Sequence, residues 1–217
     1  MYSFIYLASQ SPRRQELLHQ MGVQFELLLP VSQKDAEALE IPQTNEDPKV
    51  YVQRVTLAKC AAALKRWQML KTSQPTMTWA PILCADTTVS LLKDSKAEIL
   101  AKPQNEADAK RILGLLSGKS HHVMTAVAIQ INQDSQPVTA LQISSVEFSK
   151  LSEQQIQRYI NSGEHAGKAG AYGIQGLAST FIKQIQGSHS GIMGLPLYET
   201  AQLLIQAEVK FTLNPHK

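Results

Sequence analysis

Short apolar runs alternate along this chain with longer stretches of helical periodicity. Residues 4–8 and 82–85 have the length and composition of buried strands, and residues 12–22 and 49–70 carry apolar side chains at helical spacing. The same reading predicts further strands at 25–31, 123–131, 140–148 and 181–185, and helices at 105–116, 152–163 and 196–206. Strands that alternate with helices are typical of an α/β fold. The 217 residues suit one domain, or two small lobes that share a core.

Charge and composition narrow the class of protein. A net charge of +3 is too small to predict nucleic-acid binding, which usually shows as a clustered basic face. No stretch approaches the roughly 18 apolar residues of a membrane-spanning helix, and the N-terminus lacks the basic region of a signal peptide. Cys60 and Cys84 have no zinc-type spacing and suit a reducing compartment. We therefore expect a cytoplasmic enzyme or binding domain that contacts neither nucleic acid nor membrane.

The segment Ser9-Gln10-Ser11-Pro12-Arg13-Arg14 joins the first expected strand to the first expected helix. Free N–H groups at a helix N-terminus favour an anion, but two arginines in the first turn oppose the helix dipole. A phosphate or carboxylate bound between the arginines would remove this conflict. The alternative is that both arginines are solvated, which costs about a few tenths of a kcal/mol.

Asp86 follows the apolar run 82–85 and precedes Thr87 and Thr88. We expect the strand to end here, and open α/β sheets bind ligands at the carboxyl ends of their strands. The carboxylate could hold a divalent cation or accept a proton from attacking water. The alternative is that Asp86 starts a turn and the two threonines are ordinary strand residues.

A third candidate is the glycine-rich segment 163–176. It contains five glycines, four of them at every third position, which allows the backbone to approach a ligand closely. It is not a Walker A loop, because Ala169 stands where that motif has Ser or Thr. A flexible surface loop is the alternative, although Tyr172 and Ile174 are unusual in a mere linker.

Other polar residues carry no function when taken singly. His121 and His122 lack the spacing of metal ligands, so we expect them to be exposed or hydrogen-bonded. Lys59 and Lys102 by themselves resemble ordinary solvated lysines.

Taken together, the ordered motifs of the chain resemble the Maf family of nucleoside-triphosphate pyrophosphatases. Within that family they are similar to the branch that acts on dTTP and UTP, on account of Arg13-Arg14, Thr87 and Gly173-Ile174-Gln175-Gly176. The motifs that carry the resemblance run through most of the chain: Leu7 to Leu18, Ala85-Asp86-Thr87, Lys102-Pro103, Leu116-Ser117-Gly118, Gly163-Glu164, Lys168 to Gly176 and Gly194-Leu195-Pro196-Leu197.

The resemblance implies a mixed α/β fold with an elongated central sheet flanked by helices, and a single catalytic domain over residues 1–217 with two lobes around a deep cleft. It also implies a homodimer. The reaction it implies is hydrolysis of dTTP, UTP and, as further candidates, modified pyrimidine triphosphates to the monophosphate and pyrophosphate. The alternative function is a non-catalytic regulator of septum formation that acts through a protein partner.

The resemblance also assigns roles to individual residues. Asp86 is the expected proton acceptor for water that attacks the α-phosphorus, with Lys59 and Lys102 as catalytic partners. Mg²⁺ or Mn²⁺ is the expected cofactor, with Asp86 as a ligand. The expected substrate-binding residues are Arg13, Thr87 and Gln175, which set base specificity, and Ser9, Arg14 and Lys168, of which Arg14 and Lys168 face the triphosphate together with Lys59 and Lys102.

The chain departs from the family pattern after the second expected strand, where members usually have a glutamate in the cleft. Lys34 stands at or near that place, so Asp35 or Glu37 is the expected substitute, and Asp35 is the second expected metal ligand.

Overall fold

The computed structural model describes residues 1–30, 32, 38–93 and 96–214. In these residues a mixed sheet of seven strands has the order β2-β1-β3-β5-β6-β7, with β4 paired to β3. The first three strands of that order run parallel, and the other pairs are antiparallel. The strands are β1 (Ile5–Leu7), β2 (Phe25–Leu27), β3 (Ile82–Lys93), β4 (Lys96–Leu100), β5 (Ser120–Gln130), β6 (Val138–Phe148) and β7 (Ile182–Gln186).

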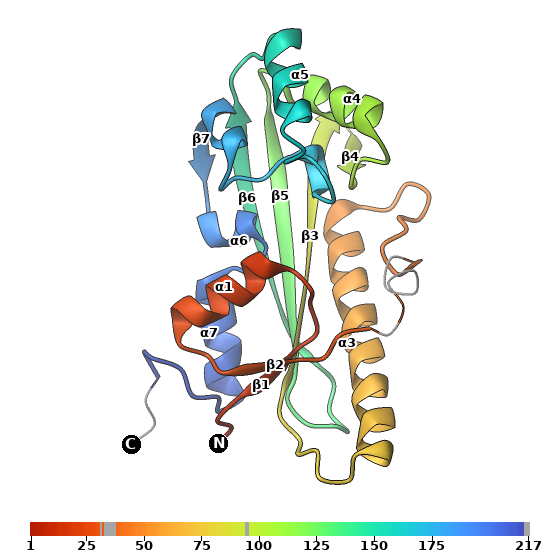
Figure 1. Cartoon of the computed structure of the whole chain (residues 1–217), viewed down its shortest axis with the longest axis vertical. Coiled ribbons are helices and arrows are strands. Elements are labelled where there is room, and N and C mark those ends of the chain that lie inside the picture. The colour runs from red at the N-terminus through yellow and green to blue at the C-terminus, as the bar shows by residue number, and fades with distance from the viewer. Residues whose placement is uncertain (31, 33–37, 94–95, 215–217) are drawn as a thin grey trace.

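Helices pack against both faces of this long, twisted sheet (Figure 1). The longest, α3 (Pro48–Ser73), runs along β3 and β5, while α1 (Pro12–Met21) and α7 (Leu197–Gln206) cover the other side at the end near the termini. At the opposite end α4 (Glu106–Leu116) packs on α5 (Glu153–Asn161). The short helices are η1 (Ala169–Ala171), η2 (Leu177–Phe181) and α6 (His189–Met193).

The alternation of side chains along β3 builds the core on both faces. Ile82 and Cys84 pack with residues of α3, whereas Leu83 and Ala85 pack with residues of α1 and α7. This is the two-residue period of a strand that is buried on both sides. Farther along, Val89 joins a third cluster that contains α4 and α5. One strand therefore contributes residues to three of the four clusters of buried hydrophobic side chains.

The expected α/β fold with an elongated, mixed sheet flanked by helices is confirmed, whereas its division into two lobes stays a prediction. Helix α1 ends as expected at Gly22, which has a φ of 73°. The Ser152–Gln155 capping box at the start of α5 is present. No helix in the described part of the chain is long and apolar enough to cross a membrane.

Two strand predictions were wrong. The second strand ends at Leu27 instead of continuing to residue 31. The strand expected to end before Asp86 continues without a break to Lys93, with Asp86 and Thr87 paired to Ala126 and Thr125 of β5. Asp86 therefore lies in the middle of a strand and not at its carboxyl end. The cause is the long antiparallel partner β5, which satisfies the backbone of β3 beyond the apolar run.

Candidate active site

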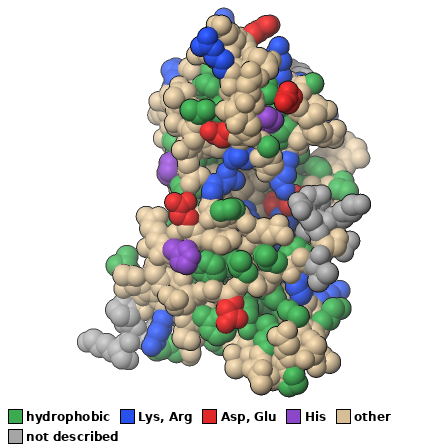
Figure 2. All heavy atoms as spheres, viewed as in Figure 1, with side chains coloured by type: hydrophobic (Ala, Val, Ile, Leu, Met, Phe, Trp, Pro, Cys, Tyr) green, Lys and Arg blue, Asp and Glu red, His purple; other side chains and the backbone are tan. Residues whose placement is uncertain are grey.

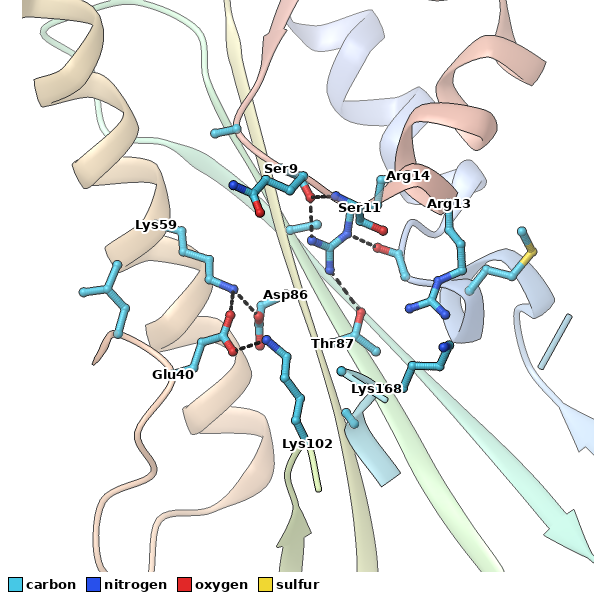
Figure 3. Close-up of a pocket in the computed structure, with 18 of the residues that line it drawn as sticks. Ser9, Ser11, Arg13, Arg14, Glu40, Lys59, Asp86, Thr87, Lys102 and Lys168 are labelled. Atoms are coloured by element: carbon cyan, nitrogen blue, oxygen red, sulfur yellow. Dashed lines mark hydrogen bonds and ion pairs between the residues drawn. The ribbon is translucent and has the colours of Figure 1, made fainter. Parts of the chain in front are cut away.

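A cavity of about 540 Å³ opens beside the middle of β3. Its walls come from the β1–α1 junction, α3, β3, the segment after β4 and the glycine-rich segment (Figure 3). The structure brings together nine residues predicted from the sequence, all of which line this cavity: Ser9, Arg13, Arg14, Lys59, Asp86, Thr87, Lys102, Lys168 and Gln175. The tenth, Asp35, lies outside the described residues, as does its alternative Glu37.

Two carboxylates and two lysines form a chain of ion pairs on one side of the cavity (Figure 3). The Lys59 ammonium lies 2.6 Å from Asp86 Oδ1 and also 2.6 Å from Glu40 Oε1. Glu40 Oε2 accepts a third hydrogen bond, again of 2.6 Å, from Lys102 Nζ. Asp86 Oδ2 accepts no hydrogen bond from any described residue, so this oxygen is open to a ligand or a water molecule.

The neighbouring lysines explain why Glu40 stays ionised although it is partly buried. Burial raises the pKa of Glu40, but Lys59 and Lys102 outweigh that effect and hold the pKa below its usual range. The side chains of Lys59 and Asp86 are 17% and 9% exposed, so their ion pair is shielded from water. Such a pair is held more firmly than one on an open surface.

Glu40 is a carboxylate of the cavity that sequence reasoning missed. The acidic residue was expected at 35 or 37, closer to the second strand, yet the described carboxylate that reaches Lys59 from the stretch before α3 is at position 40. Residues 39–47 form turns and irregular chain before α3. Since irregular chain has no hydrophobic period, its course could not be predicted, and the only available signal was that Glu40 is acidic and precedes a helix carrying Lys59.

Arg14 connects the β1–α1 junction to the sheet and to α6. Its Nε donates to the Gly194 carbonyl at 2.8 Å, Nη1 donates to Ser9 Oγ at 3.1 Å, and Nη2 donates to Thr87 Oγ1 at 3.4 Å. Thr87 Oγ1 lies 2.9 Å from Thr125 Oγ1. Arg14 therefore lines the cavity with three of its five N–H donors engaged by the protein, and two remain for a ligand.

The direction of the hydrogen bonds in this chain can be derived. Thr125 Oγ1 donates its single proton to the Gly191 carbonyl at 2.7 Å, so the proton between the two threonines belongs to Thr87. Thr87 then has no proton left for a ligand and presents only a lone pair. Thr125, buried within the sheet, thus orients Thr87.

Arg13 and Lys168 lie on the other side of the cavity without a carboxylate partner among the described residues. Arg13 Nε is buried and makes no hydrogen bond. Among the residues that the structure describes, Lys168 Nζ donates only to the carbonyls of Glu164 and Ala166, at 2.5 and 3.5 Å. Burial lowers the pKa of both side chains, and for Lys168 the nearby Arg13 lowers it further. Two neighbouring cations without counter-ions favour an anionic ligand.

The cavity as a whole is strongly cationic. Its described lining contains seven Lys and Arg residues against two carboxylates. Figure 2 shows Lys and Arg side chains gathered around a hollow near the middle of the molecule. The N-terminus of α1 also borders the cavity, and no side chain caps it. Its free N–H groups add to the attraction for phosphate.

The donor set determines which metal ion the cavity could hold. No group of three or more His, Cys, Asp or Glu side chains in the described part of the chain is arranged to hold a metal. Glu40 and Asp86 nevertheless converge on one ammonium group, which marks a place where a cation is stabilised. Mg²⁺ commonly binds through one or two carboxylates together with substrate phosphates. These residues therefore fit an ion that arrives with a phosphate ligand.

Of the two adjacent histidines, His121 and His122, one is buried and the other is exposed. His121 is buried and its Nε2 lies 2.8 Å from the Tyr172 hydroxyl, while His122 is exposed. Burial, and next to it His122, lowers the pKa of His121 to about 4. Cys60 and Cys84 are buried free thiols.

Comparison with known proteins agrees with this geometry. The family described as Maf-like protein matches residues 4–207. Several relatives bear the name dTTP/UTP pyrophosphatase. The one from Cupriavidus pinatubonensis is 51% identical over 97% of this chain and 100% of its own length. The one from Ralstonia nicotianae is 53% identical over 94% of this chain and 94% of its own length. The one from Burkholderia lata is 51% identical over 97% of this chain and 96% of its own length.

Proposed function

Because the chain belongs to the Maf family, we propose that it is a nucleoside-triphosphate pyrophosphatase that hydrolyses dTTP and UTP to the monophosphate and pyrophosphate. Modified pyrimidine triphosphates are further candidate substrates. The observation that carries the proposal is a carboxylate with one open oxygen, Asp86, inside a cavity lined by seven cations. The names of the relatives favour this enzyme over a regulator of septum formation.

The open oxygen of Asp86 suits it to accept a proton. A water molecule attacks the α-phosphorus, its proton passes to Asp86 Oδ2, and the bond from the α-phosphorus to the oxygen that bridges to the β-phosphorus breaks. Pyrophosphate leaves with that bonding pair. Lys59 holds Asp86 Oδ1 at 2.6 Å and so fixes the orientation of the carboxylate.

The cations stabilise the charge that spreads over the phosphoryl oxygens in the transition state. Lys59 and Lys102 stabilise the negative charge of the phosphate oxygens nearest Asp86, while Arg14 and Lys168 extend the positive charge across the cavity. Ser9 supports Arg14 by accepting its Nη1 hydrogen bond. In this arrangement catalysis depends mainly on position and charge.

Glu40 and Asp86 are the residues that would hold Mg²⁺ or Mn²⁺. When bound with the triphosphate, the ion supplies positive charge that neutralises phosphate oxygens. This assignment moves the second carboxylate from Asp35 to Glu40, on the basis of the shared contact with Lys59.

Arg13, Thr87 and Gln175 are proposed to select the base. Uracil and thymine present the same ring edge, and Gln175 offers both a donor and an acceptor. The methyl group of thymine adds a discrimination of only about 1–3 kcal/mol in an apolar recess. Acceptance of both dTTP and UTP follows.

Assembly and location remain predictions. We propose a homodimer in the cytoplasm that binds no nucleic acid. Size-exclusion chromatography with light scattering tests the first part, because a dimer has twice the 24.0 kDa mass of the chain.

The function is tested by a panel of triphosphates with Mg²⁺ or Mn²⁺, in which released pyrophosphate and monophosphate are both measured. The proposal expects dTTP and UTP to be hydrolysed in preference to CTP, ATP and GTP. Binding of dTTP and UTP without release of pyrophosphate under any metal would refute it.

A further inference from the structure

The Gly163-Glu164 motif has no role in the chemistry described above, yet its glutamate lies beneath the segment that carries Gln175. This segment, Gly173 to Gly176, belongs to the chain between α5 and β7, which crosses in front of the sheet in Figure 1. Gln175 is exposed and borders both the main cavity and a second one of about 550 Å³. The position of Gln175 therefore decides what that wall of the site offers to a ligand.

Backbone N–H groups that donate to one carboxylate, that of Glu164, hold the end of this segment. Glu164 Oε2 accepts from the Leu177 N–H at 2.7 Å, and Oε1 accepts from the Ala178 N–H at 3.4 Å. Both amides directly follow Gly176. Bonds from backbone N–H to an ionised carboxylate are stronger than those between neutral groups.

The beginning of the segment is held through Tyr159. The Tyr159 hydroxyl donates to Glu164 Oε1 at 3.0 Å and accepts from the Gly173 N–H at 3.3 Å. Tyr159 is 3% exposed, and burial, followed by Glu164, raises its pKa, so the hydroxyl keeps its proton. The two side chains thus connect both ends of a four-residue segment to one carboxylate.

The carboxylate lies so close to Gly176 that a side chain at this position would displace it from its present place. A Cβ on Gly176 would lie 2.2 Å from Glu164 Oε2, well inside van der Waals contact. The backbone carbonyl of Glu164 also accepts from Lys168 Nζ at 2.5 Å. Glu164 therefore contacts the Gln175 segment with its side chain and a cavity cation with its backbone.

We propose that Tyr159 and Glu164 are positioning residues for base selection, which hold the Gly173–Gly176 segment so that Gln175 and the adjacent backbone meet the pyrimidine edge. This inference rests on the proposed function. Uracil presents an acceptor at O4, where cytosine presents an amino donor. A segment fixed at both ends distinguishes these patterns, whereas a loosened one adapts to either.

The test uses the full chain with Tyr159→Phe and Glu164→Gln, each of which removes hydrogen-bonding capacity with little change in volume. Tyr198→Phe and Glu26→Gln are matched controls, since both residues are exposed and line neither cavity. The kcat and KM for UTP and CTP are measured for each. We expect the ratio of kcat/KM for UTP over CTP to fall about tenfold in the two test variants, the equivalent of one hydrogen bond, mainly through a higher KM for UTP.

A purely structural role would reduce the fraction of active enzyme and lower kcat for both nucleotides equally, with KM and the ratio unchanged. That result would overturn the inference. In the Gln175→Ala background, Glu164→Gln should lower the ratio by much less than tenfold, because the part of its effect that passes through Gln175 is already lost. A full additional tenfold loss there would also contradict the inference.

Failure of the proposed function is distinguishable from failure of the inference. A wild-type chain that hydrolyses neither dTTP nor UTP refutes the function, and with it base selection. Amide hydrogen exchange of residues 173–178 measures how firmly Tyr159 and Glu164 hold this backbone, and it requires no catalysis. Faster exchange is expected in Tyr159→Phe and Glu164→Gln. Exchange at the wild-type rate in these two variants, in an enzyme that is active, would refute the inference that Tyr159 and Glu164 hold the segment.

Discussion

Replacement of Glu40 by glutamine removes one negative charge from between two lysines. The Lys59–Glu40 pair is 2.6 Å long with side chains 17% and 21% exposed, and a charge-assisted hydrogen bond of this kind contributes about 1.5–3 kcal/mol. Lys102 is 48% exposed, so its pair adds only about 0–1 kcal/mol. Glutamine keeps one acceptor, and we expect Glu40→Gln to lower the free energy of unfolding by about 2 kcal/mol, a fall in Tm of about 4–8 °C.

The same change should reduce activity. Without Glu40 the Lys59 ammonium pairs with Asp86 alone, which weakens the carboxylate as a proton acceptor, and one proposed metal ligand is lost. We expect kcat for UTP to fall about a hundredfold, within the range for impaired general-base catalysis, and the Mg²⁺ concentration for half-maximal rate to rise.

The pH dependence of stability follows from the lowered pKa of Glu40. The stability it adds is present above its unfolded value of 4.5 and is lost as the pH falls through the folded pKa. Urea unfolding at several pH values should therefore show the difference between wild type and Glu40→Gln shrinking below about pH 4.5.

Glu46 provides the matched control. It lies in the same stretch before α3, pairs with Arg54 at 2.6 Å, and does not line the cavity. Glu46→Gln should lose stability and keep its activity. Wild-type kcat and Mg²⁺ dependence in Glu40→Gln would refute the reasoning, as would an equal loss of activity in the control.

Three further predictions concern packing and hydrogen bonds. Thr125→Val removes the acceptor for the Thr87 proton and should lower kcat/KM for UTP about tenfold; Thr125→Ser should restore it, and a valine variant with wild-type kinetics would contradict the assignment. Burial lowers the pKa of His121 to about 4, below its unfolded value of 6.5, so the free energy of unfolding of the wild type should fall by about 3 kcal/mol as the pH drops from 6.5 to 4. Urea unfolding at several pH values should show a weaker dependence of this free energy on pH in His121→Phe. An unchanged dependence on pH would be evidence against this cause. Gly170→Ala should destabilise more than Gly118→Ala in thermal unfolding, because both have φ near +70° but only at 170 would a Cβ lie 2.9 Å from a valine side chain; equal losses would show that steric contact does not matter.

Local signals predicted the elements whose causes are local. The capping box of Ser152 and Gln155 begins α5, and Gly22 ends α1, because each depends on hydrogen bonds within a few residues. Asp86 was recognised as a site residue, but its place within β3 was not. The strand continues because β5, nearly forty residues farther along, pairs with it, and such a partner leaves no signal in residues 86–88 themselves.

The candidate site was predictable where motifs are contiguous and not where they depend on the path of irregular chain. Arg13, Arg14 and Asp86 stand in recognisable motifs, and all line the cavity. Glu40 was missed because the stretch before α3 carries no period. The Thr87–Thr125 contact was equally hidden, since it arises only from the register of β3 and β5.

The central claim is that water activated by Asp86 attacks the α-phosphorus. Hydrolysis of UTP in ¹⁸O-labelled water, followed by mass spectrometry of both products, tests it directly. The account predicts one ¹⁸O atom in UMP and none in pyrophosphate, with the rate greatly reduced in Asp86→Asn. Label in pyrophosphate would place the attack on the β-phosphorus, and an unchanged rate in Asp86→Asn would remove Asp86 as the proton acceptor; either result would contradict the account.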